Sequence, residues 1–449
     1  MTKTELRAAS TLAGVFSLRL LGLFMIYPVF AAYARHLSGA TPATIGLALG
    51  IYGLSQGLLQ IPFGILSDRM GRKGLIVLGL VIFATGSAIA GSATTIHGVI
   101  LGRLLQGAGA VGSVILALVA DLTEPEHRTQ AMAMVGITIG MSFLVALVLG
   151  PLVAMFVGVP GIFWLTAALA VAAIPVVVFV VPNPRRIVVH RDAEAVPAKL
   201  AAVLRNTELL RLDFGIFALH AMLTASFLAI PQMFARTLHL GAGRDWMVYL
   251  PVLLVSVAVM VPAIVIAEKR RRMKSVLVGS VIALGLGNLL LFADGGHAPA
   301  LLVALALFFS GFNVMEATLP SLVTKTAPVE AKGTATGVYS SSQFIGIFFG
   351  GVVGGWVHQR FGTPAVFLLS VGVAALWLLV AATMRPPRYL ATRTLQVSDL
   401  HSRDPEALTA RLLAVAGVAE AVLAPEEDAV YLRVDSATYD AAKALAAVQ

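Results

Sequence analysis

Three charged side chains interrupt long apolar stretches of this sequence, where an ion without a partner is unfavourable. They are Arg19, Arg103 and Glu316. Glu316 is the only carboxylate deep within such a stretch, so it is the leading candidate for a group that carries protons. Arg19 and Glu316 each lie about 8 residues, or about 12 Å, from the inner end of their predicted helix, and we expect them to meet. Protonation of Glu316 would then switch this contact; a static pair that fixes helix packing is the alternative.

Arg103 opens a second segment with possible chemistry, residues 103–110 (RLLQGAGA). An arginine within a membrane span must face protein or a water-filled cavity. In a cavity, its positive charge would stabilise the negative charge that a nearby acid acquires when it loses its proton. A structural arginine bonded to backbone carbonyls is the other interpretation, and the residues leave both open.

A short polar turn, residues 64–73 (GILSDRMGRK), separates the second apolar stretch from the third. Its acid, its bases and its glycines are Gly64, Asp68, Arg69, Gly71, Arg72 and Lys73. A carboxylate at the membrane edge is unfavourable unless it has partners, so Asp68 predicts a specific contact. Anchoring by positive charge at the inner surface is the simpler interpretation of the bases.

Polar residues inside the apolar stretches are the candidates for lining a substrate cavity. They are Tyr27, Tyr52, Gln56, Ser142, His220, Asn313, Tyr339 and Gln343. A lone polar residue in a span more often bonds to a neighbouring helix than to a ligand, so each of these side chains has a packing role as its alternative.

Helices that cross a membrane must position these residues. Of the 449 residues, 58% are hydrophobic and only 12% are charged, a balance that would give a soluble protein of this length an apolar surface. We therefore expect an all-α membrane protein with twelve transmembrane helices in two six-helix bundles. The apolar runs long enough to cross about 30 Å of hydrocarbon lie at residues 11–33, 43–66, 74–93, 97–120, 130–156, 160–182, 212–235, 246–267, 275–293, 299–324, 333–357 and 363–384.

Lysine and arginine gather in alternate connections between these runs, whereas the opposite connections hold only Arg35, Arg236, Arg244 and Arg360. Basic residues concentrate on the cytoplasmic side of membrane proteins. We therefore predict a multi-pass protein of the cell's inner membrane with both termini in the cytoplasm. This asymmetry accounts for the net charge of +9, so no nucleic-acid partner is expected.

The two halves of the membrane region resemble each other at a spacing near 200 residues: Asp68 and Arg72 have counterparts in Glu268 and Arg272. Between the halves, residues 198–210 have helical spacing and either lie along the inner membrane surface or simply connect the bundles. We divide the chain into an N-terminal bundle, a cytoplasmic linker, a C-terminal bundle and a cytoplasmic tail, at residues 1–182, 183–211, 212–385 and 390–449.

The tail alternates between strand and helix patterns. Strands are predicted at residues 393–397, 418–423 and 430–434, and helices at 404–415 and 437–447. This β-α-β-β-α order predicts a small ferredoxin-like domain that lacks its final strand.

Several function classes are disfavoured by what the sequence lacks. It has no cysteine, no H-E-x-x-H, no G-x-S-x-G and no phosphate-binding P-loop. We therefore expect neither an enzyme nor an ATP-driven pump, and neither a metal site nor a cofactor.

The turn at residues 64–73 resembles the G-x-L-x-D-R-x-G-R-K signature of the major facilitator superfamily. The resemblance implies two bundles that rock about a site between them. It also implies that Asp68 faces the start of the eleventh helix, near Gly333, and that Arg72 pairs with Asp121 at the end of the fourth. We expect this cluster to be a latch for the outward-open state, in which the helix dipole stabilises Asp68 by up to about 2 kcal/mol.

Other segments are similar to patterns within that superfamily. Residues 103–110 resemble the R-x-x-Q-G-x-G-A pattern of its proton-coupled members, and Gly150-Pro151 is similar to the centre of its antiporter motif, which implies export. Residues 16–29, together with the tail, look like those of the YajR-type transporters. In that group the tail is a cytoplasmic ferredoxin-like module with an implied regulatory role.

The leading functional prediction is proton-driven export of small hydrophobic or cationic molecules by alternating access, carried out by a monomer in the lipid bilayer. Uptake or facilitated diffusion of a nutrient such as a sugar is the first alternative. A ligand sensor that does not transport is the second.

Overall fold

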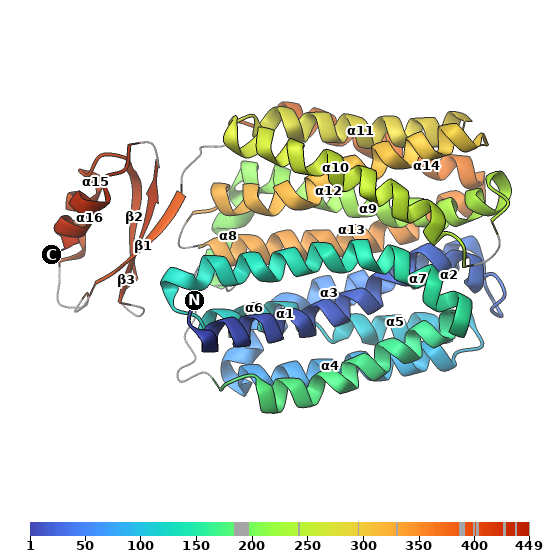
Figure 1. The fold of residues 1–449 in the computed structure, drawn as a ribbon, viewed down its shortest axis with the longest axis horizontal. Helices are drawn as coiled ribbons and strands as arrows, with labels where there is room; N and C mark the ends of the chain where they lie inside the picture. Colours follow the sequence, from blue (N-terminus) through green and yellow to red (C-terminus); the bar gives the residue numbers. More distant parts are fainter. Residues whose placement is uncertain are drawn as a thin grey trace.

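Long helices lie side by side along one axis, and a small sheet with two short helices caps one end of them (Figure 1). The computed structural model describes residues 1–183, 197–240, 243–294, 296–328, 331–385, 391–397, 400, 404–424, 428–435 and 438–448, without a few of the side chains in these ranges. We call the end with the sheet the tail end and the opposite one the far end.

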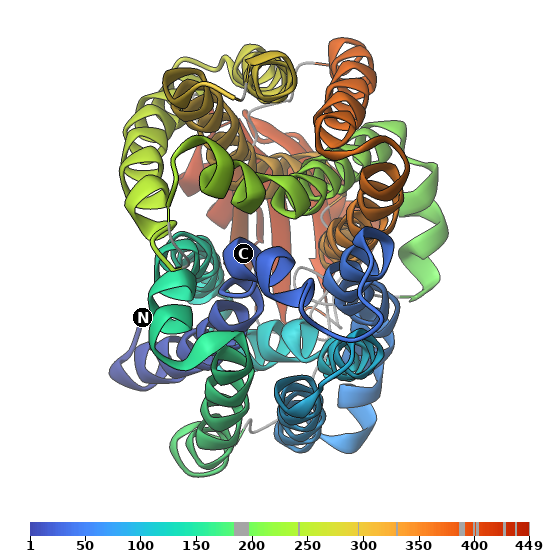
Figure 2. The same cartoon turned by 90° about the vertical axis from the view of Figure 1, so that its right-hand side faces the viewer.

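The helices form two groups. The first group is α1 (Lys3–Phe24), α2 (Tyr27–Ala34), α3 (Pro42–Met70), α4 (Arg72–Ser92), α5 (Ile96–Ala108), α6 (Gly112–Asp121), α7 (Pro125–Pro175) and the π-helical turn η1 (Val176–Val180). The second group is α9 (Thr207–Thr237), α10 (Trp246–Lys269), α11 (Met273–Asp294), α12 (Ala298–Thr326), α13 (Lys332–Phe361) and α14 (Thr363–Ala382). Figure 2, seen from the far end, shows the two groups facing each other. The short helix α8 (Pro197–Arg205) lies against α9 and α13.

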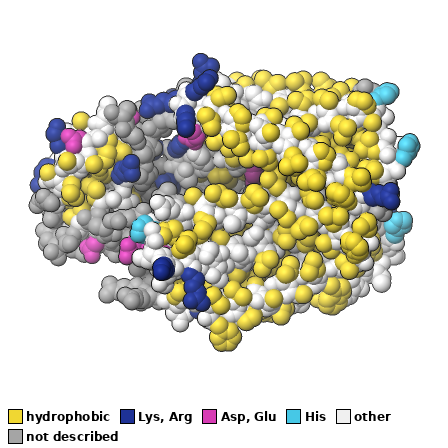
Figure 3. Space-filling view, viewed as in Figure 1, with side chains coloured by type: hydrophobic (Ala, Val, Ile, Leu, Met, Phe, Trp, Pro, Cys, Tyr) yellow, Lys and Arg dark blue, Asp and Glu magenta, His cyan; other side chains and the backbone are white. Residues whose placement is uncertain are grey.

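Ten helical segments of the described chain are long and apolar enough to cross a membrane. Gln130–Val180 spans 51 residues, enough for two crossings, and it bends at Gly158, where φ is +67°. The 30-residue helix α13 is not among the ten; it is rich in glycine and packs between α3 and α9. Apolar side chains cover the flanks of the long helices, while lysine and arginine gather at the tail end (Figure 3).

Three predicted elements differ in detail from the observed ones. The run at 11–33 is two helices, because Pro28, the second residue of α2, cannot continue the backbone hydrogen bonds of α1. The run at 97–120 breaks at Gly109, where a Cβ atom would collide with the Gly79 carbonyl oxygen of α4. The single helix predicted at 198–210 ends at Arg205, because Asn206 caps α9 through the backbone N–H groups of Glu208 and Leu209.

Glycines bring α3 and α13 into backbone contact near the far end. A Cβ atom at Gly46 would collide with the carbonyl oxygen of Gly351, and one at Gly351 with that of Gly46. Farther along α3, a Cβ atom at Gly57 would lie 3.2 Å from the Ser341 carbonyl oxygen. At Gly64, nearest the tail end, the described residues within 4 Å of such an atom reduce to Ser113 of the first group. The two helices therefore touch from the far end to the middle and separate toward the tail end.

Other contacts also close the far end. The Tyr27 hydroxyl of α2 lies 3.3 Å from Thr224 Oγ1 of α9, and its ring meets Phe227 edge-on at 5.5 Å. The backbone N–H of Ala43 donates to Gln359 Oε1 over 3.2 Å. These contacts join the two groups across the far end.

The tail domain consists of β1 (Ala391–Gln396), α15 (Pro405–Leu413), β2 (Val418–Ala424), β3 (Ala429–Val434) and α16 (Ala441–Val448). Its three strands form an antiparallel sheet in the order β1-β3-β2, so the predicted succession of elements is confirmed. On β3, Val430, Leu432 and Val434 pack beneath the helices in one apolar cluster.

The glycine contact gives a stability prediction. Gly46→Ala should lower the melting temperature in detergent, because overpacking a tight contact costs about 1–3 kcal/mol. Gly372→Ala is the matched control, since a Cβ atom there meets nothing within 4 Å. Equal melting temperatures for the two variants would show that α3 and α13 are not in backbone contact.

Candidate functional site

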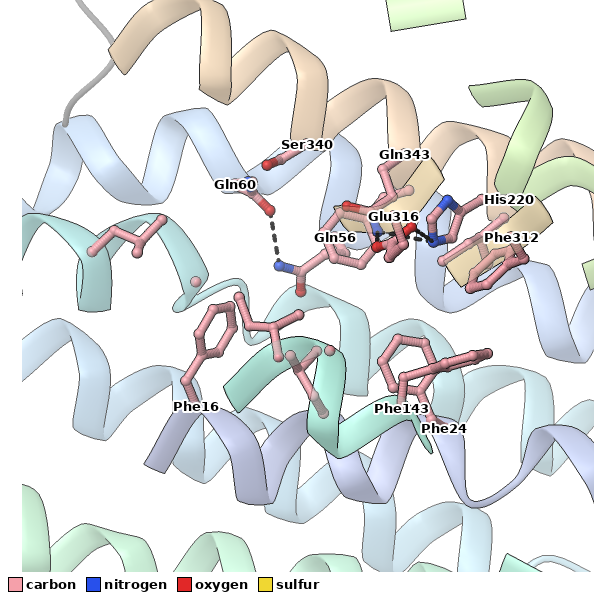
Figure 4. Close-up of a pocket in the computed structure, with 17 residues that line it drawn as sticks. Phe16, Phe24, Gln56, Gln60, Phe143, His220, Phe312, Glu316, Ser340 and Gln343 are labelled. Carbon is pink, nitrogen blue, oxygen red and sulfur yellow. Dashed lines mark hydrogen bonds and ion pairs between the residues drawn. The ribbon is translucent and has the colours of Figure 1, made fainter. Parts of the chain in front are cut away.

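A central cavity lies between the two groups and is lined from both (Figure 4). Its polar lining comes from Gln56 and Gln60 of α3 and from His220, Glu316, Ser340 and Gln343 of the second group. Its aromatic lining is Phe16, Phe24, Phe143, Phe312 and Phe344. An apolar cavity with a few converging polar groups is the usual form of a small-molecule site.

The polar centre of the cavity joins three helices of the second group. Gln343 Nε2 lies 3.4 Å from Glu316 Oε1 and 2.9 Å from His220 Nε2. His220 Nδ1 lies 3.3 Å from the Ile216 carbonyl oxygen, so a proton on Nδ1 leaves Nε2 free to accept from Gln343. Glu316 Oε2 has no hydrogen-bond partner in the described part of the chain and lies 3.8 Å from His220 Nε2. Glu316 and His220 are therefore adjacent proton acceptors on the cavity wall.

Arg19 does not meet Glu316, so the expected contact between them is wrong in this conformation. Arg19 donates to the Tyr52 hydroxyl over 2.9 Å and to Gln56 Oε1. Gln56 lines the cavity and Arg19 lies behind it, 3% exposed, with its guanidinium 5.2 Å from the Phe83 ring centre. The partners available on α3 hold the arginine within the first group.

Arg103 has the contacts of a structural arginine. Its guanidinium donates to the carbonyl oxygens of Ala48 and Leu49 over 3.3 and 3.4 Å and to Gln106 Oε1 over 3.0 Å. It also stacks on the Tyr52 ring, 4.9 Å from the ring centre. These bonds tie α5 to α3.

Of the predicted cavity residues, Gln56, His220 and Gln343 line the cavity, and four others bond elsewhere. Tyr27 bonds to Thr224 near the far end, Tyr52 to Arg19, Ser142 to Ser17 and Asn313 to Ser256. Tyr339 is buried, and its hydroxyl has no partner among the described residues.

Two kinds of lining or buried residue escaped prediction. The phenylalanines of the cavity were expected to be ordinary apolar residues of the membrane region. The spacing of Phe16, Leu20 and Phe24, however, puts all three on one face of α1, and this face lines the cavity. Asp213 stood at the edge of a predicted span, yet it is only 6% exposed, and its Oδ2 has no partner in the described structure. Together with Glu316, the second group therefore contains two acids that each have a carboxylate oxygen without a partner among the described residues.

The turn at residues 64–73 contains the expected ion pair. Arg72 Nε lies 2.9 Å from Asp121 Oδ2, and its Nη1 donates to Ser67 Oγ over 2.7 Å. Gly71 links α3 to α4 with φ +87°, a conformation that favours glycine. Lys73 Nζ donates to the Val178 carbonyl oxygen, and Arg69 is exposed. The side chain of Asp68, the other predicted member, lies outside the described part.

The second group contains a counterpart of this turn, in which the acid of the turn forms an ion pair. Glu268 pairs with Lys325 over 2.6 Å, and Lys325 lies in the last turn of α12 as Asp121 lies in the last turn of α6. Arg271 stands where the first group has Gly71, and its φ is likewise positive, at +53°. The repeat therefore keeps a positive φ at this position although its glycine is replaced.

Gly150 of the predicted antiporter pair is a packing position. A Cβ atom there would collide with the carbonyl oxygen of Met25, at the break between α1 and α2. Pro151 follows it inside α7. The pair therefore lets α7 approach the backbone of the α1–α2 break.

Comparison with known proteins gives the same architecture. The sequence matches the Major Facilitator Superfamily over residues 12–350 and, in an overlapping match, 212–423. The inner membrane transport protein YajR of Escherichia coli (strain K12) is 44% identical over 436 residues, which is 97% of this chain and 96% of that protein. The multidrug resistance protein MdtH of Aeromonas salmonicida (strain A449) is 28% identical over 379 residues, 82% of this chain and 93% of that protein.

Solved structures of low identity show the fold. The crystal structure of a bacterial homolog of the human lysosomal transporter Spinster, inward-facing and occupied, has a TM-score of 0.72 at 13% identity and covers 86% of this chain and 98% of its own. The human organic anion transporter MFSD10 has a TM-score of 0.60 at 17% identity and covers 85% of this chain and all of its own.

The buried ion pair gives a testable stability difference. Arg72→Gln should destabilise the protein by about 3–5 kcal/mol, because it removes a cation from a buried carboxylate. Adding Asp121→Asn should recover part of this loss, since the double variant no longer buries that charge. Arg69→Gln, an exposed change in the same turn, is the control for thermal unfolding. A single variant as stable as the control would contradict a stabilising Arg72–Asp121 pair.

Proposed function

This chain belongs to the major facilitator superfamily and is a multi-pass membrane transporter of small molecules, not an enzyme; from this premise, we propose that it exports small hydrophobic or cationic molecules in exchange for protons. The observation that carries the proposal is Glu316 on the wall of the cavity between the two groups, with one oxygen bonded to Gln343 and the other unbonded among the described residues.

A carboxylate in such a cavity couples two ligands by competition. Ionised Glu316 attracts a cationic substrate into an otherwise aromatic cavity, and protonated Glu316 does not. Binding of a proton from one side therefore releases the substrate, and loss of the proton to the other side restores the site. His220 is the adjacent acceptor for that proton. Arg19 retains two donor atoms without a partner in the described structure. It lies behind Gln56, where its positive charge would stabilise the negative charge of ionised Glu316.

The proposed architecture has twelve crossings. Gln130–Val180 supplies two of them, and α13 supplies the crossing missing from the ten apolar segments. We propose bundles at residues 1–182 and 212–385 joined by a cytoplasmic linker at 183–211. Lysine and arginine at the tail end support cytoplasmic termini and an inner-membrane location. In this orientation the conformation is closed outside and separated inside.

The turn at residues 64–73 is proposed as the latch of the opposite, outward-open state. Arg72 and Asp121 hold the base of the turn. In that state, the approach of α3 to α13 at the tail end would bring Asp68 to the first turn of α13, where the helix dipole favours an acid. Arg103 is proposed to position α3 behind the cavity.

The tail is proposed to be a regulatory ferredoxin-like domain at residues 390–449. Its strand order β1-β3-β2 is that of such a sheet without the last edge strand. The names of two relatives support the transport proposal: one is an inner membrane transport protein and the other a multidrug resistance protein.

The proposal is tested by Glu316→Gln in proteoliposomes loaded with a fluorescent lipophilic cation under an imposed pH gradient. We expect proton-dependent efflux to fall by about 100-fold or more, the range for loss of a positioned proton-transfer group. Efflux down the dye's own gradient should persist at a lower rate, since the amide preserves the shape of the site but lacks the charge that attracts a cation.

Glu124→Gln is the control, because Glu124 is a largely exposed acid at the tail end. Proton-dependent efflux that survives in Glu316→Gln would remove Glu316 from the coupling role. Flux that is unaffected by pH in the unaltered protein would instead favour facilitated diffusion.

A further inference from the structure

We propose that the tail domain is a wedge: its central strand β3 contacts the tail ends of both helix groups and keeps them apart, so that it must leave before the transporter can close at that end. This inference rests on the alternating-access function proposed above and adds the regulation of that movement. It concerns the face of the sheet that the tail's own helices do not cover.

The sheet of the tail domain has helices on one face only. Val430, Leu432 and Val434 lie under α15 and α16, whereas the alternate residues of β3 point to the opposite face. Those residues, Ala429, Tyr431 and Arg433, are nevertheless only 0%, 3% and 6% exposed. The sheet faces the ends of the long helices (Figure 1), and Tyr431 and Arg433 bond to residues of the transporter body.

The first group is contacted through a phenol. Arg128, in the first turn of α7, donates from Nη1 to the Tyr431 hydroxyl over 3.1 Å. Arg128 is itself only 3% exposed, so this hydrogen bond is shielded from water. A charged donor on a shielded acceptor makes one of the stronger hydrogen bonds in proteins.

The second group is contacted through a guanidinium. Arg433 donates to the carbonyl oxygens of Lys325 and Ala327, at the C-terminal end of α12, where the helix dipole favours a cation. Glu420 of the neighbouring strand lies 3.5 Å from Arg433 and holds it in this position. Asp435, just after β3, adds a contact of 3.7 Å to Arg271 in the α10–α11 turn.

One short strand thus fixes the separation of the two groups. Tyr431 and Arg433 are two residues apart on the same face of β3, about 6.6 Å along the strand. Looking from the far end, Figure 2 shows the sheet behind the middle of the body, where it crosses from one group toward the other. Since α3 and α13 part beyond Gly57, the strand lies at the end where the groups must approach for the cavity to close. The bound tail favours the conformation that is open at the tail end.

Distances between spin labels test the wedge in the full-length protein. The chain has no cysteine, so Thr4→Cys and Arg270→Cys place one label on each group at the tail end. Tyr431→Phe removes only the hydroxyl that Arg128 contacts, and Arg433→Gln removes the guanidinium. Each should raise the population of short distances about tenfold, the effect of one charge-assisted hydrogen bond on a two-state equilibrium.

Arg411→Gln is the matched control: it removes the charge of an exposed arginine on α15 and should leave the distances unchanged. Distances in Tyr431→Phe and Arg433→Gln equal to those of this control would overturn the wedge. The distances need neither substrate nor proton coupling, so a failure of the Glu316 proposal does not affect this test.

A cross-link gives a second, independent test. Joining Arg128→Cys to Tyr431→Cys with a cleavable bismaleimide should stop turnover of the fluorescent cation and keep the tail-end distance long. Cleavage of the linker should restore the flux. Undiminished flux with the cross-link in place would show that the tail does not have to leave.

Discussion

The backbone contact between α3 and α13 is the constraint on which the rest of this structure depends. Gly46 and Gly351 allow each helix to reach the carbonyl oxygen of the other, a distance that no side chain permits. Because this contact closes the far end and ends at Gly57, the two groups diverge only toward the tail end. The cavity lies beside the point of divergence, where a small rotation of one group changes its width most directly. Van der Waals contact between small residues is the packing that a bilayer favours.

Buried charges divide into those that hold each group together and those that face the gap. Arg103 on α3 carbonyls and Arg72 on Asp121 are buried and bond within the first group, and the partly exposed pair of Lys325 and Glu268 bonds within the second. Glu316 is different, because it stands at the boundary with one oxygen unbonded among the described residues. When a proton binds to Glu316, the contact between the two groups changes while each group stays rigid. The most direct response is a change in the angle between the groups.

The sequence predicts those features that depend on local pattern. Apolar length located the helices, alternation located the three tail strands, and the motif at residues 64–73 located the Arg72–Asp121 pair. Features that depend on tertiary neighbours were not predictable. Spacing gave Arg19 and Glu316 similar depth, but the partners of Arg19 are Tyr52 and Gln56 on α3. The docking of the tail depends on Arg433 reaching helix-end carbonyls, which no sequence pattern marks.

We infer that the proton state of Glu316 sets the angle between the two rigid groups, and thereby whether the α3–α13 contact closes the far end. The most direct measurement is the distance at the far end, between spin labels at Thr94→Cys and Arg360→Cys, as a function of pH. We expect the distance distribution to shift between acidic and alkaline buffer in the unaltered background. The Glu316→Gln variant should keep one distribution throughout. An equal pH response with and without Glu316 would contradict it.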